Sequence, residues 1–404
     1  MSSLVAYTCI VFASLLLSLL YWRLAPLPRR PLLVAVERPR PCPPAPAPPA
    51  GRPAAAAAPA AVPAAPQSPP QSPQSCTYAW RAYRLADIER EFPELKRCHI
   101  TTYGGQLQEQ LVKLPCQTSD NSKADFIMLP PYMAQECNWP EYGGGYCLHP
   151  RNTYRKGPVI GCRKETIAVA RNLTERHGKR VVLVDYHPGE WVPDGPLFVW
   201  AKVNHKVGVE KSPGKRSYFR SGQDVSMPPP CWPRCAGFSK RLASNAGDLR
   251  KKRYFMSFIG KLSNHKIRGT LQRLFNDNKR QLITGSRSDF EQVMLDTLFC
   301  LLPAGNEPFS YRFGECVCAG GVPVLVADNW VPPFNVLVPF EDYGVRVDEH
   351  RAESLALDLK ALPWWQLEAK QAKAMQVCRE YLINARVHAV QLLKAISVLK
   401  PGAS

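Results

Sequence analysis

The stretch from residue 299 to residue 349 constrains the fold of this chain more than any other part of the sequence. It opens with an apolar run, Phe299–Leu302, that is closed by proline and glycine and predicts a buried strand. Ser310–Ala319 has the length of a short helix, starts on a favoured N-cap residue and is followed by Gly320. A second apolar run, Val322–Ala327, is rich in β-branched residues. The segment therefore predicts a strand–helix–strand unit of an α/β fold.

Polar residues collect where the first predicted strand of this unit ends. Asn306, Ser310 and Arg312 follow the strand, and Glu315 comes one helical turn later. Parallel sheets bind ligands at the carboxyl ends of their strands, and a cation beside free backbone N–H groups suits a phosphate. A carboxylate one turn away suits sugar hydroxyls. The alternative interpretation is an ordinary α/β unit that carries a surface Arg–Glu pair.

The spacing of these residues resembles that of a known family. Exostosin-like glycosyltransferases (family 47) share the pattern P-x-G-x-x-x-x-S-x-R-x-x-E, followed by A-G-x-x-P-V, in their nucleotide-sugar-binding region. The matching residues here are Pro303, Gly305, Ser310, Arg312, Glu315, Ala319, Gly320, Pro323 and Val324. The family's strand end L-x-x-F-x-G and the arginine that opens the following helix are matched by Phe258, Gly260 and Arg268.

Earlier parts of the chain match the same family less closely. Ala124–Tyr132 resembles a strand end of the family, and Gly222–Pro230 resembles its link between two lobes. Around Gly178–His187 the chain departs from the family pattern, because lysine and arginine replace the usual Asp-His pair on the acceptor side. Independently of the family, alternation of strands and helices predicts a parallel sheet here. The predicted strands are Arg97–Thr102, Ala124–Leu129, Arg180–Asp185 and Arg253–Gly260, and the helices include Lys164–His177, Lys266–Asn276, Ala352–Leu362 and Trp365–Leu399.

The resemblance implies two Rossmann-like lobes of the GT-B type. We place an acceptor-side lobe at residues 76–228 and a nucleotide-sugar-binding lobe at residues 229–404. The resemblance also implies that the C-terminal helix crosses back to the first lobe.

The N-terminal part has a different character. Leu4–Trp22 is apolar and uncharged, and predicts a membrane anchor over residues 1–23. A cleaved signal peptide is the alternative, and the arginines after the span disagree with a lumenal orientation. Residues 24–75 are rich in proline and alanine and predict a disordered, extended stem. We expect a single-pass type II protein of the Golgi membrane whose catalytic part is lumenal.

The cysteines and the net charge indicate the cellular compartment of this protein and the class of partner it binds. The 14 cysteines show no zinc-binding spacing and favour disulfides in an oxidising compartment, with Cys137–Cys147 and Cys231–Cys235 as predicted local bridges. Asn172 begins a glycosylation sequon, Asn-Leu-Thr. The net charge of +19 comes without any nucleic-acid-binding motif, so no nucleic acid partner is expected. A solvated basic surface and attraction to anionic donors or polysaccharide both remain open.

The chain contains no Asp-x-Asp triplet of the kind that holds a metal–diphosphate complex, so no metal cofactor is expected. Following the family pattern, the predicted donor-binding residues are Gly260, Lys261, Arg268, Gly305, Ser310, Arg312 and Glu315. The arginines and the lysine would neutralise the diphosphate, and the carboxylate of Glu315 would accept hydrogen bonds from the ribose.

The family inverts the anomeric centre, which requires one general base for the acceptor hydroxyl. Asp185 and His187, at the end of a predicted first-lobe strand, are the candidate catalytic residues, and Glu190 in the same loop stays open.

Together these features predict an inverting hexosyl- or pentosyltransferase. It would move a sugar from a UDP-linked donor to a glycan or glycoprotein hydroxyl in the secretory pathway. The expected partners are the membrane and the acceptor, and both a homo-oligomer and a hetero-oligomer are compatible with the sequence. The alternative is a catalytically silent partner subunit of an active transferase. A basic polysaccharide-binding protein is a third interpretation.

Overall fold

The computed structural model describes most of the second half of the chain and parts of the first. The described residues are 78–96, 102–130, 163–186, 192–193, 195–203, 211–212, 215–216, 218–244, 248–277 and 279–399. The predicted anchor, the stem, His187, Glu190 and the Cys137–Cys147 bridge lie outside them. Within these ranges no helix is both long and apolar enough to span a membrane.

The first part of the fold is a five-stranded sheet in which every pairing is parallel. Its strands, in spatial order, are β1 (Trp80–Ala82), β2 (Phe126–Leu129), β3 (Arg180–Asp185), β5 (Phe198–Lys202) and β8 (Val225–Ser226). Its helices are α2 (Leu85–Glu91), α3 (Thr102–Leu111) and α4 (Arg163–His177). A small antiparallel sheet of β4 (Val192–Pro193), β7 (Lys215–Arg216) and β6 (Lys211–Ser212) accompanies it.

Both faces of this sheet are buried, as a parallel sheet requires. Along β3, Val181 and Leu183 belong to one core cluster, which also contains residues of α2 and α4. Val182 and Val184 point the other way into a second cluster. The strands predicted at residues 124–129 and 180–185 and the helix at 164–177 are confirmed. The strand predicted at 97–102 is wrong at its last residue, because Thr102 opens α3.

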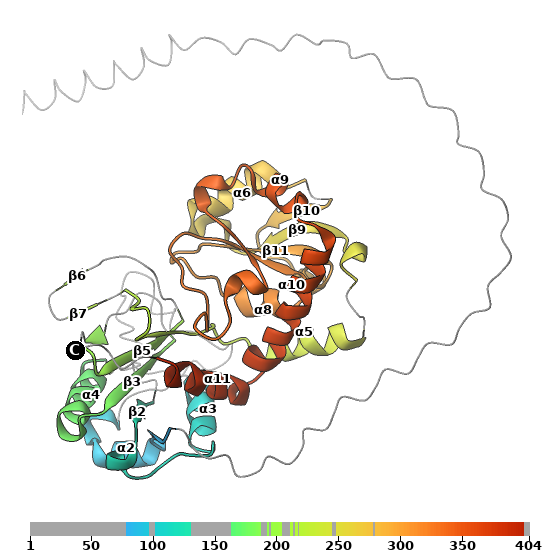
Figure 1. The fold of residues 1–404 in the computed structure, drawn as a ribbon. Coiled ribbons are helices and arrows are strands. Elements are labelled where there is room, and N and C mark those ends of the chain that lie inside the picture. Colours follow the sequence, from blue (N-terminus) through green and yellow to red (C-terminus); the bar gives the residue numbers. More distant parts are fainter. Residues whose placement is uncertain are drawn as a thin grey trace, which may run out of the picture. The chain divides into compact units, whose positions relative to one another are not determined.

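The second part contains another five-stranded, fully parallel sheet. Its strands, in spatial order, are β10 (Gln281–Thr284), β9 (Tyr254–Ile259), β11 (Thr297–Pro303), β12 (Val322–Val326) and β13 (Val345–Val347). Its helices are α5 (Trp232–Ser244), α6 (Lys266–Phe275), α7 (Phe290–Leu295), α8 (Phe313–Cys318), α9 (Leu355–Lys360) and α10 (Trp364–Val377). Figure 1 shows α6 on one side of this sheet and α8 with α10 on the other. The structure thus confirms an α/β fold with two parallel sheets.

The β11–α8–β12 unit confirms the predicted strand–helix–strand segment, with one correction. The helix is shorter than predicted, because Ser310 does not cap it and the N-cap is Arg312. The Oγ of Ser310 accepts a hydrogen bond from the Arg312 N–H at 3.3 Å and closes a turn before the helix. The helix ends at Cys318 with Ala319 as its C-cap. The predicted stop residue Gly320 follows directly, and its φ of +73° is a left-handed conformation that glycine adopts readily.

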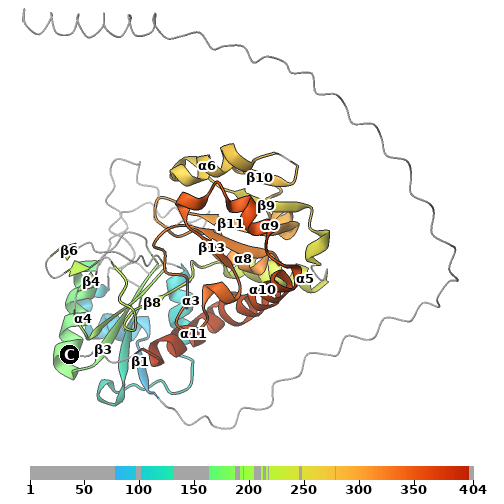
Figure 2. The same cartoon turned by 45° about the horizontal axis from the view of Figure 1, so that its top comes forward.

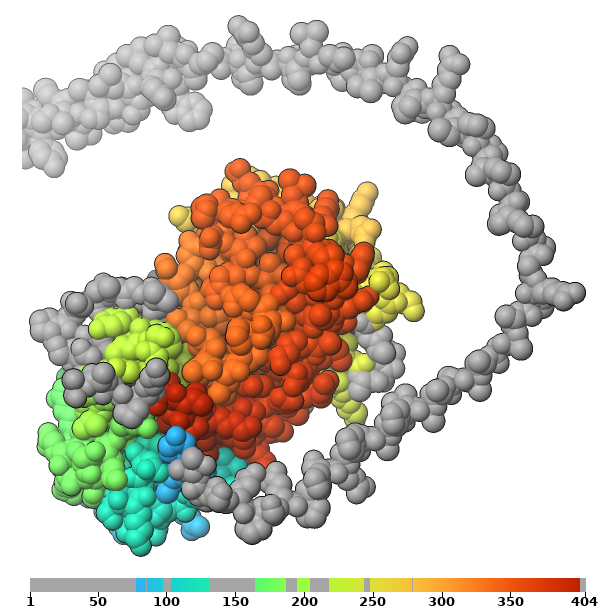
Figure 3. Space-filling model, viewed as in Figure 1, coloured from blue at the N-terminus to red at the C-terminus, as the bar shows by residue number. Residues whose placement is uncertain are grey.

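The helix predicted at Trp365–Leu399 is divided into three segments. A π-helical turn, Cys378–Leu382, follows α10, and α11 (Ala385–Ser397) begins after a break in which Asn384 caps the Val387 N–H. Leu392 and Ile396 of α11 belong to the core cluster of the first sheet. Figures 2 and 3 show this last helix, in dark red, beside the blue and cyan N-terminal elements. The expectation that the C-terminal helix returns to the first lobe is therefore confirmed.

Candidate functional site

The carboxyl ends of β9 and β11 form the centre of the candidate site. Ile259 is the last residue of β9, and its carbonyl accepts a hydrogen bond from Arg312 Nε at 3.1 Å. The same arginine precedes α8 and donates from Nη1 to Glu315 Oε2 at 2.5 Å. Arg312 therefore connects the end of one strand to the helix that follows the neighbouring strand. The structure brings the predicted Arg312 and Glu315 together.

A second arginine, which the sequence did not indicate, completes the surroundings of Glu315. Arg234 Nη1, from α5, donates to Glu315 Oε1 at 2.8 Å, so each carboxylate oxygen receives one guanidinium. The Glu315 side chain is only 5% exposed, against 27% for Arg312 and 51% for Arg234. The hydrogen bond to this carboxylate raises the pKa of Arg234. Two cations around one buried carboxylate leave the cluster with a net positive charge.

Phe290 supports both arginines. Its ring centre lies 4.7 Å from the Arg312 guanidinium carbon and 5.4 Å from that of Arg234. Both distances are within the range of a cation–π contact. We refer to Arg234, Phe290, Arg312 and Glu315 as the arginine cluster. Its parts come from α5, α7 and α8, so the cluster exists only in the folded chain.

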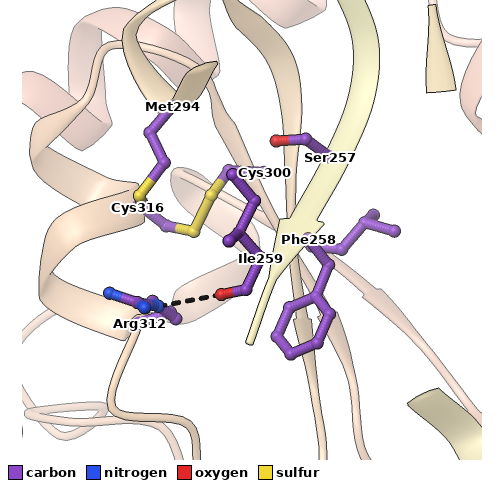
Figure 4. Close-up of a pocket in the computed structure, with 8 residues that line it drawn as sticks. Ser257, Phe258, Ile259, Met294, Cys300, Arg312 and Cys316 are labelled. Carbon is purple, nitrogen blue, oxygen red and sulfur yellow. Dashed lines mark hydrogen bonds between the residues drawn. A yellow bond between two sulfur atoms is a disulfide. The ribbon is translucent and has the colours of Figure 1, made fainter. Parts of the chain in front are cut away.

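A small cavity lies behind Arg312 (Figure 4). Its lining includes Ser257, Met294 and the Cys300–Cys316 disulfide, which joins β11 to α8. Its volume is about 10 Å³, which is at the lower limit for one water molecule. This cavity is too small for a nucleotide, and it lies where α8 packs against the sheet.

Arg268 was predicted to face a diphosphate, but its guanidinium nitrogens donate hydrogen bonds to backbone carbonyls. Nε donates to the carbonyl of Ala304 at 2.7 Å, Nη1 to that of Lys261 at 2.9 Å, and Nη2 to that of Pro303 at 3.3 Å. Burial and, secondarily, the nearby Arg312 lower the pKa of Arg268 to about 10, so it stays cationic at neutral pH. Through these hydrogen bonds Arg268 connects the loops after β9 and β11, and its guanidinium is buried under them.

The remaining predicted donor-side residues differ in exposure. Lys261 is exposed in the loop after β9, whereas Ser310 is 2% exposed. A Cβ at Gly260 would come within 2.8 Å of the Phe258 ring, and one at Gly305 within 3.0 Å of Arg268 Nη2. Packing within the chain therefore already accounts for both glycines.

Of the predicted catalytic residues, only Asp185 lies in the described part of the chain. It ends β3, is fully buried and stands in register with Lys202 of β5, which is also buried. The Lys202 ammonium lies 4.2 Å from the Trp200 ring centre. An acidic and a basic group thus share the carboxyl edge of the first sheet. Asn172 lies inside α4, where its Oδ1 is buried and has no hydrogen-bond partner among the described residues.

Disulfides surround the helix that carries Glu315. The Cys231–Cys235 bridge was predicted and is confirmed. Cys300–Cys316 and Cys318–Cys378 were not predicted, because their partners are 16 and 60 residues apart. Arg234 stands between the two cysteines of the predicted bridge. Its place between two cysteines that were predicted to form a bridge is the one sequence signal that could have drawn attention to it.

The description of the family model that matches this chain is "Exostosin GT47 domain", and the match covers residues 67–362. The chain belongs to the exostosin family of glycosyltransferases. Exostosin-1 of Drosophila melanogaster is 24% identical over 233 residues, which are 51% of this chain and 30% of that protein. The probable beta-1,4-xylosyltransferase IRX10L of Arabidopsis thaliana is 38% identical over 90 residues, or 22% of each chain. This exostosin-family chain thus spans less than a third of the length of these two relatives.

Another relative is a probable glucuronosyltransferase of Oryza sativa subsp. japonica, which is 33% identical over 105 residues, 26% of this chain and 24% of that protein. Among solved structures, Anabaena HepE in complex with UDP aligns with 72% of this chain and 82% of its own, at 10% identity and a TM-score of 0.34. That degree of structural likeness is too low to support an inference.

Proposed function

We propose that this exostosin-family chain is an inverting glycosyltransferase of the GT-B type that uses a UDP-linked sugar. The observation that carries the proposal is the arginine cluster at the carboxyl ends of β9 and β11. A buried carboxylate there can accept hydroxyl hydrogen bonds, and the adjacent guanidinium can donate a charge-assisted hydrogen bond to a phosphate. Relatives named as xylosyl- and glucuronosyltransferases support a pentosyl or hexosyl donor.

The proposed donor contacts divide between two residues. A carboxylate has about four lone-pair positions, so the two arginines leave one position on each oxygen of Glu315 for the ribose hydroxyls. Nη2 of Arg312 makes no hydrogen bond within the described ranges and can donate to the diphosphate. The exposed Lys261 adds a second cation from the loop after β9.

Transfer then needs a base in the first lobe. The acceptor hydroxyl oxygen attacks the anomeric carbon as the bond to UDP breaks, and the base takes the hydroxyl proton. We assign this role to Asp185, the last residue of β3, or to His187, two residues later in the sequence. The acceptor would be a hydroxyl of a glycan or glycoprotein.

We also propose a lumenal location in the Golgi, with residues 1–23 as a type II membrane anchor and Asn172 as a glycosylation site. The bridges Cys231–Cys235, Cys300–Cys316 and Cys318–Cys378 support an oxidising compartment, because such bridges are rare in reducing ones.

A second candidate function is a catalytically silent partner subunit. Two observations favour it. Asp185 is fully buried, and Arg268 is bonded to three backbone carbonyls instead of facing a ligand.

The test compares two Arg–Glu pairs in the full-length chain. Hydrolysis of UDP-xylose, UDP-glucuronic acid and UDP-N-acetylglucosamine is measured with and without EDTA for the wild type, Glu315→Ala and Glu368→Ala. Glu368 pairs with Arg250 at 2.9 Å, but its side chain is 49% exposed. We expect the wild type and Glu368→Ala to hydrolyse one of these donors at similar rates. Glu315→Ala should hydrolyse the same donor at least about tenfold more slowly, and EDTA should not change any of the rates. A folded wild type that hydrolyses and binds none of these donors would disprove the enzyme proposal in favour of the partner subunit.

A further inference from the structure

The position of Arg234 is fixed by its own helix. It lies in the first turn of α5, between Cys231 and Cys235, whose disulfide closes that turn. The same bridge packs against Gly314 of α8, where a Cβ would come within 2.3 Å of Cys231 Sγ. Since Glu315 is the next residue, the packing of this disulfide on the Gly314 backbone holds the start of α5 close to the carboxylate.

The two arginines hold Glu315 in different ways. Arg312 is three residues from Glu315 in sequence, and such a pair forms on one helical turn without tertiary structure. Arg234 is 81 residues away and reaches the other carboxylate oxygen. A carboxylate bonded at one oxygen can still rotate, whereas bonds to both oxygens from different elements fix its plane. The Phe290 ring beneath both guanidiniums restrains them in the same way.

Arg234 also compensates the burial of the carboxylate. An ionised carboxyl group that is 5% exposed is costly unless it is paired and hydrogen-bonded. Removing one partner of such a pair leaves the other group poorly compensated. Since Arg312 also holds the end of β9 through Ile259, Arg234 is the arginine whose guanidinium bonds only to Glu315 among the described contacts.

We propose that Arg234 is a positioning residue that orients Glu315 for recognition of the donor's ribose. This inference rests on the proposed function, because it takes Glu315 as the ribose acceptor. Arg234 does not touch the donor in this arrangement. It sets the plane of the carboxylate, so that the remaining lone pair of each oxygen keeps a fixed direction.

The chain offers a matched control on the same helix. Arg241 lies seven residues after Arg234 on α5, forms an ion pair with Glu291 and has a guanidinium 5.5 Å from the Phe238 ring centre. Its side chain is 48% exposed, close to the 51% of Arg234. Methionine at either position keeps the apolar stem and removes the charge. The two substitutions therefore differ mainly in whether Glu315 loses a partner.

The experiment measures the affinity of the full-length chain for UDP and for 2′,3′-dideoxy-UDP by calorimetry. The wild type should prefer UDP by about 10- to 150-fold, which corresponds to the about 1.5–3 kcal/mol of a hydrogen bond to a charged group at about 1.4 kcal/mol per tenfold. We expect Arg234→Met to reduce this preference to about threefold or less, Arg234→Lys to restore part of it, and Arg241→Met to leave it unchanged. If Arg234 had a purely structural role, Arg234→Met would lower the affinity for both nucleotides equally and leave the preference for UDP intact.

The outcomes separate this inference from the proposed function. If the wild type prefers UDP and Arg234→Met keeps that preference, the positioning role is wrong while the donor site stands. If the folded wild type binds neither nucleotide, the donor site itself is wrong and the inference fails with it. Should Arg234→Met not fold, Arg234→Gln keeps a hydrogen-bond donor without the charge and decides the same question.

Discussion

Gly314 and Cys231 lie so close together that no side chain fits between them. A Cβ on Gly314 would be 2.3 Å from Cys231 Sγ and 3.0 Å from Cys235 Sγ. This contact brings the disulfide at the start of α5 onto α8, next to Glu315. The absence of a side chain at position 314 is therefore a condition for the arginine cluster.

Replacement of Gly314 by alanine should destabilise the protein. Overpacking a filled site costs about 1–3 kcal/mol, and the methyl group would push α5 away from α8. Chemical denaturation measures the loss. Gly269→Ala is the control, because Gly269 lies in α6 with no atom within 4 Å of its built Cβ. There, alanine should stabilise by about 0.5–1 kcal/mol, and equal effects at the two positions would contradict the packing argument.

Stability should depend on pH through His388. This residue of α11 is fully buried among the rings of Phe334, Trp232 and Tyr186, at centroid distances of 5.4, 5.7 and 6.3 Å. Neither ring nitrogen has a hydrogen-bond partner in the described chain. Burial lowers the pKa of His388 to about 3 and also raises the pKa of Tyr186. Since an unfolded histidine takes up a proton near pH 6.5, its neutral form stabilises the fold above that pH.

The contribution of His388 is lost as the pH falls from 6.5 towards 3. Relative to His388→Phe, the wild type should lose about 2 kcal/mol of unfolding free energy between pH 7 and pH 5. Urea unfolding at both pH values measures this difference, and His350→Gln, at an exposed histidine, is the control. A difference between wild type and His388→Phe that does not change with pH would show that this histidine does not titrate in that range on unfolding.

Replacement of Arg268 should weaken the loops that follow β9 and β11. Arg268→Met would leave the carbonyls of Ala304, Pro303 and Lys261 without their donor, at a cost of about 2–4 kcal/mol in total. Denaturant unfolding gives this value. Arg273→Met, at an exposed position of the same helix, should stay within about 0.5 kcal/mol of the wild type. A loss of donor affinity at unchanged stability would instead indicate that Arg268 contacts the ligand.

Two of the disulfides between described residues should differ in their contributions to stability, because they close loops of very different length. Loop-closure entropy predicts about 4 kcal/mol for Cys318–Cys378, which closes 60 residues, and about 2 kcal/mol for Cys231–Cys235, which closes 4. Double replacement of each pair by alanine and measurement of the unfolding free energy tests this order. A larger loss from the short bridge would show that its packing against Gly314, and not chain entropy, dominates.

The sequence by itself determined the parts of this protein that depend on local pattern. Apolar runs and helix-length segments predicted β11, β12, β3 and α4, because hydrophobic periodicity is set by neighbours in the chain. The ordered motif from Pro303 to Val324 indicated the family that the comparison then showed. The Cys231–Cys235 bridge was also predictable, since cysteines four residues apart can meet without any distant segment.

Only the tertiary structure decided which distant groups meet. The pairing of Arg234 with Glu315, the hydrogen bonds from Arg268 to the carbonyls of Pro303 and Ala304, and the packing of His388 against Trp232 all join segments far apart in sequence. The sequence shows that an arginine is present, but not whether its guanidinium faces a ligand, a carboxylate or the backbone. That choice depends on how helices pack on the sheets, and packing is the sum of many weak contacts that no local pattern records.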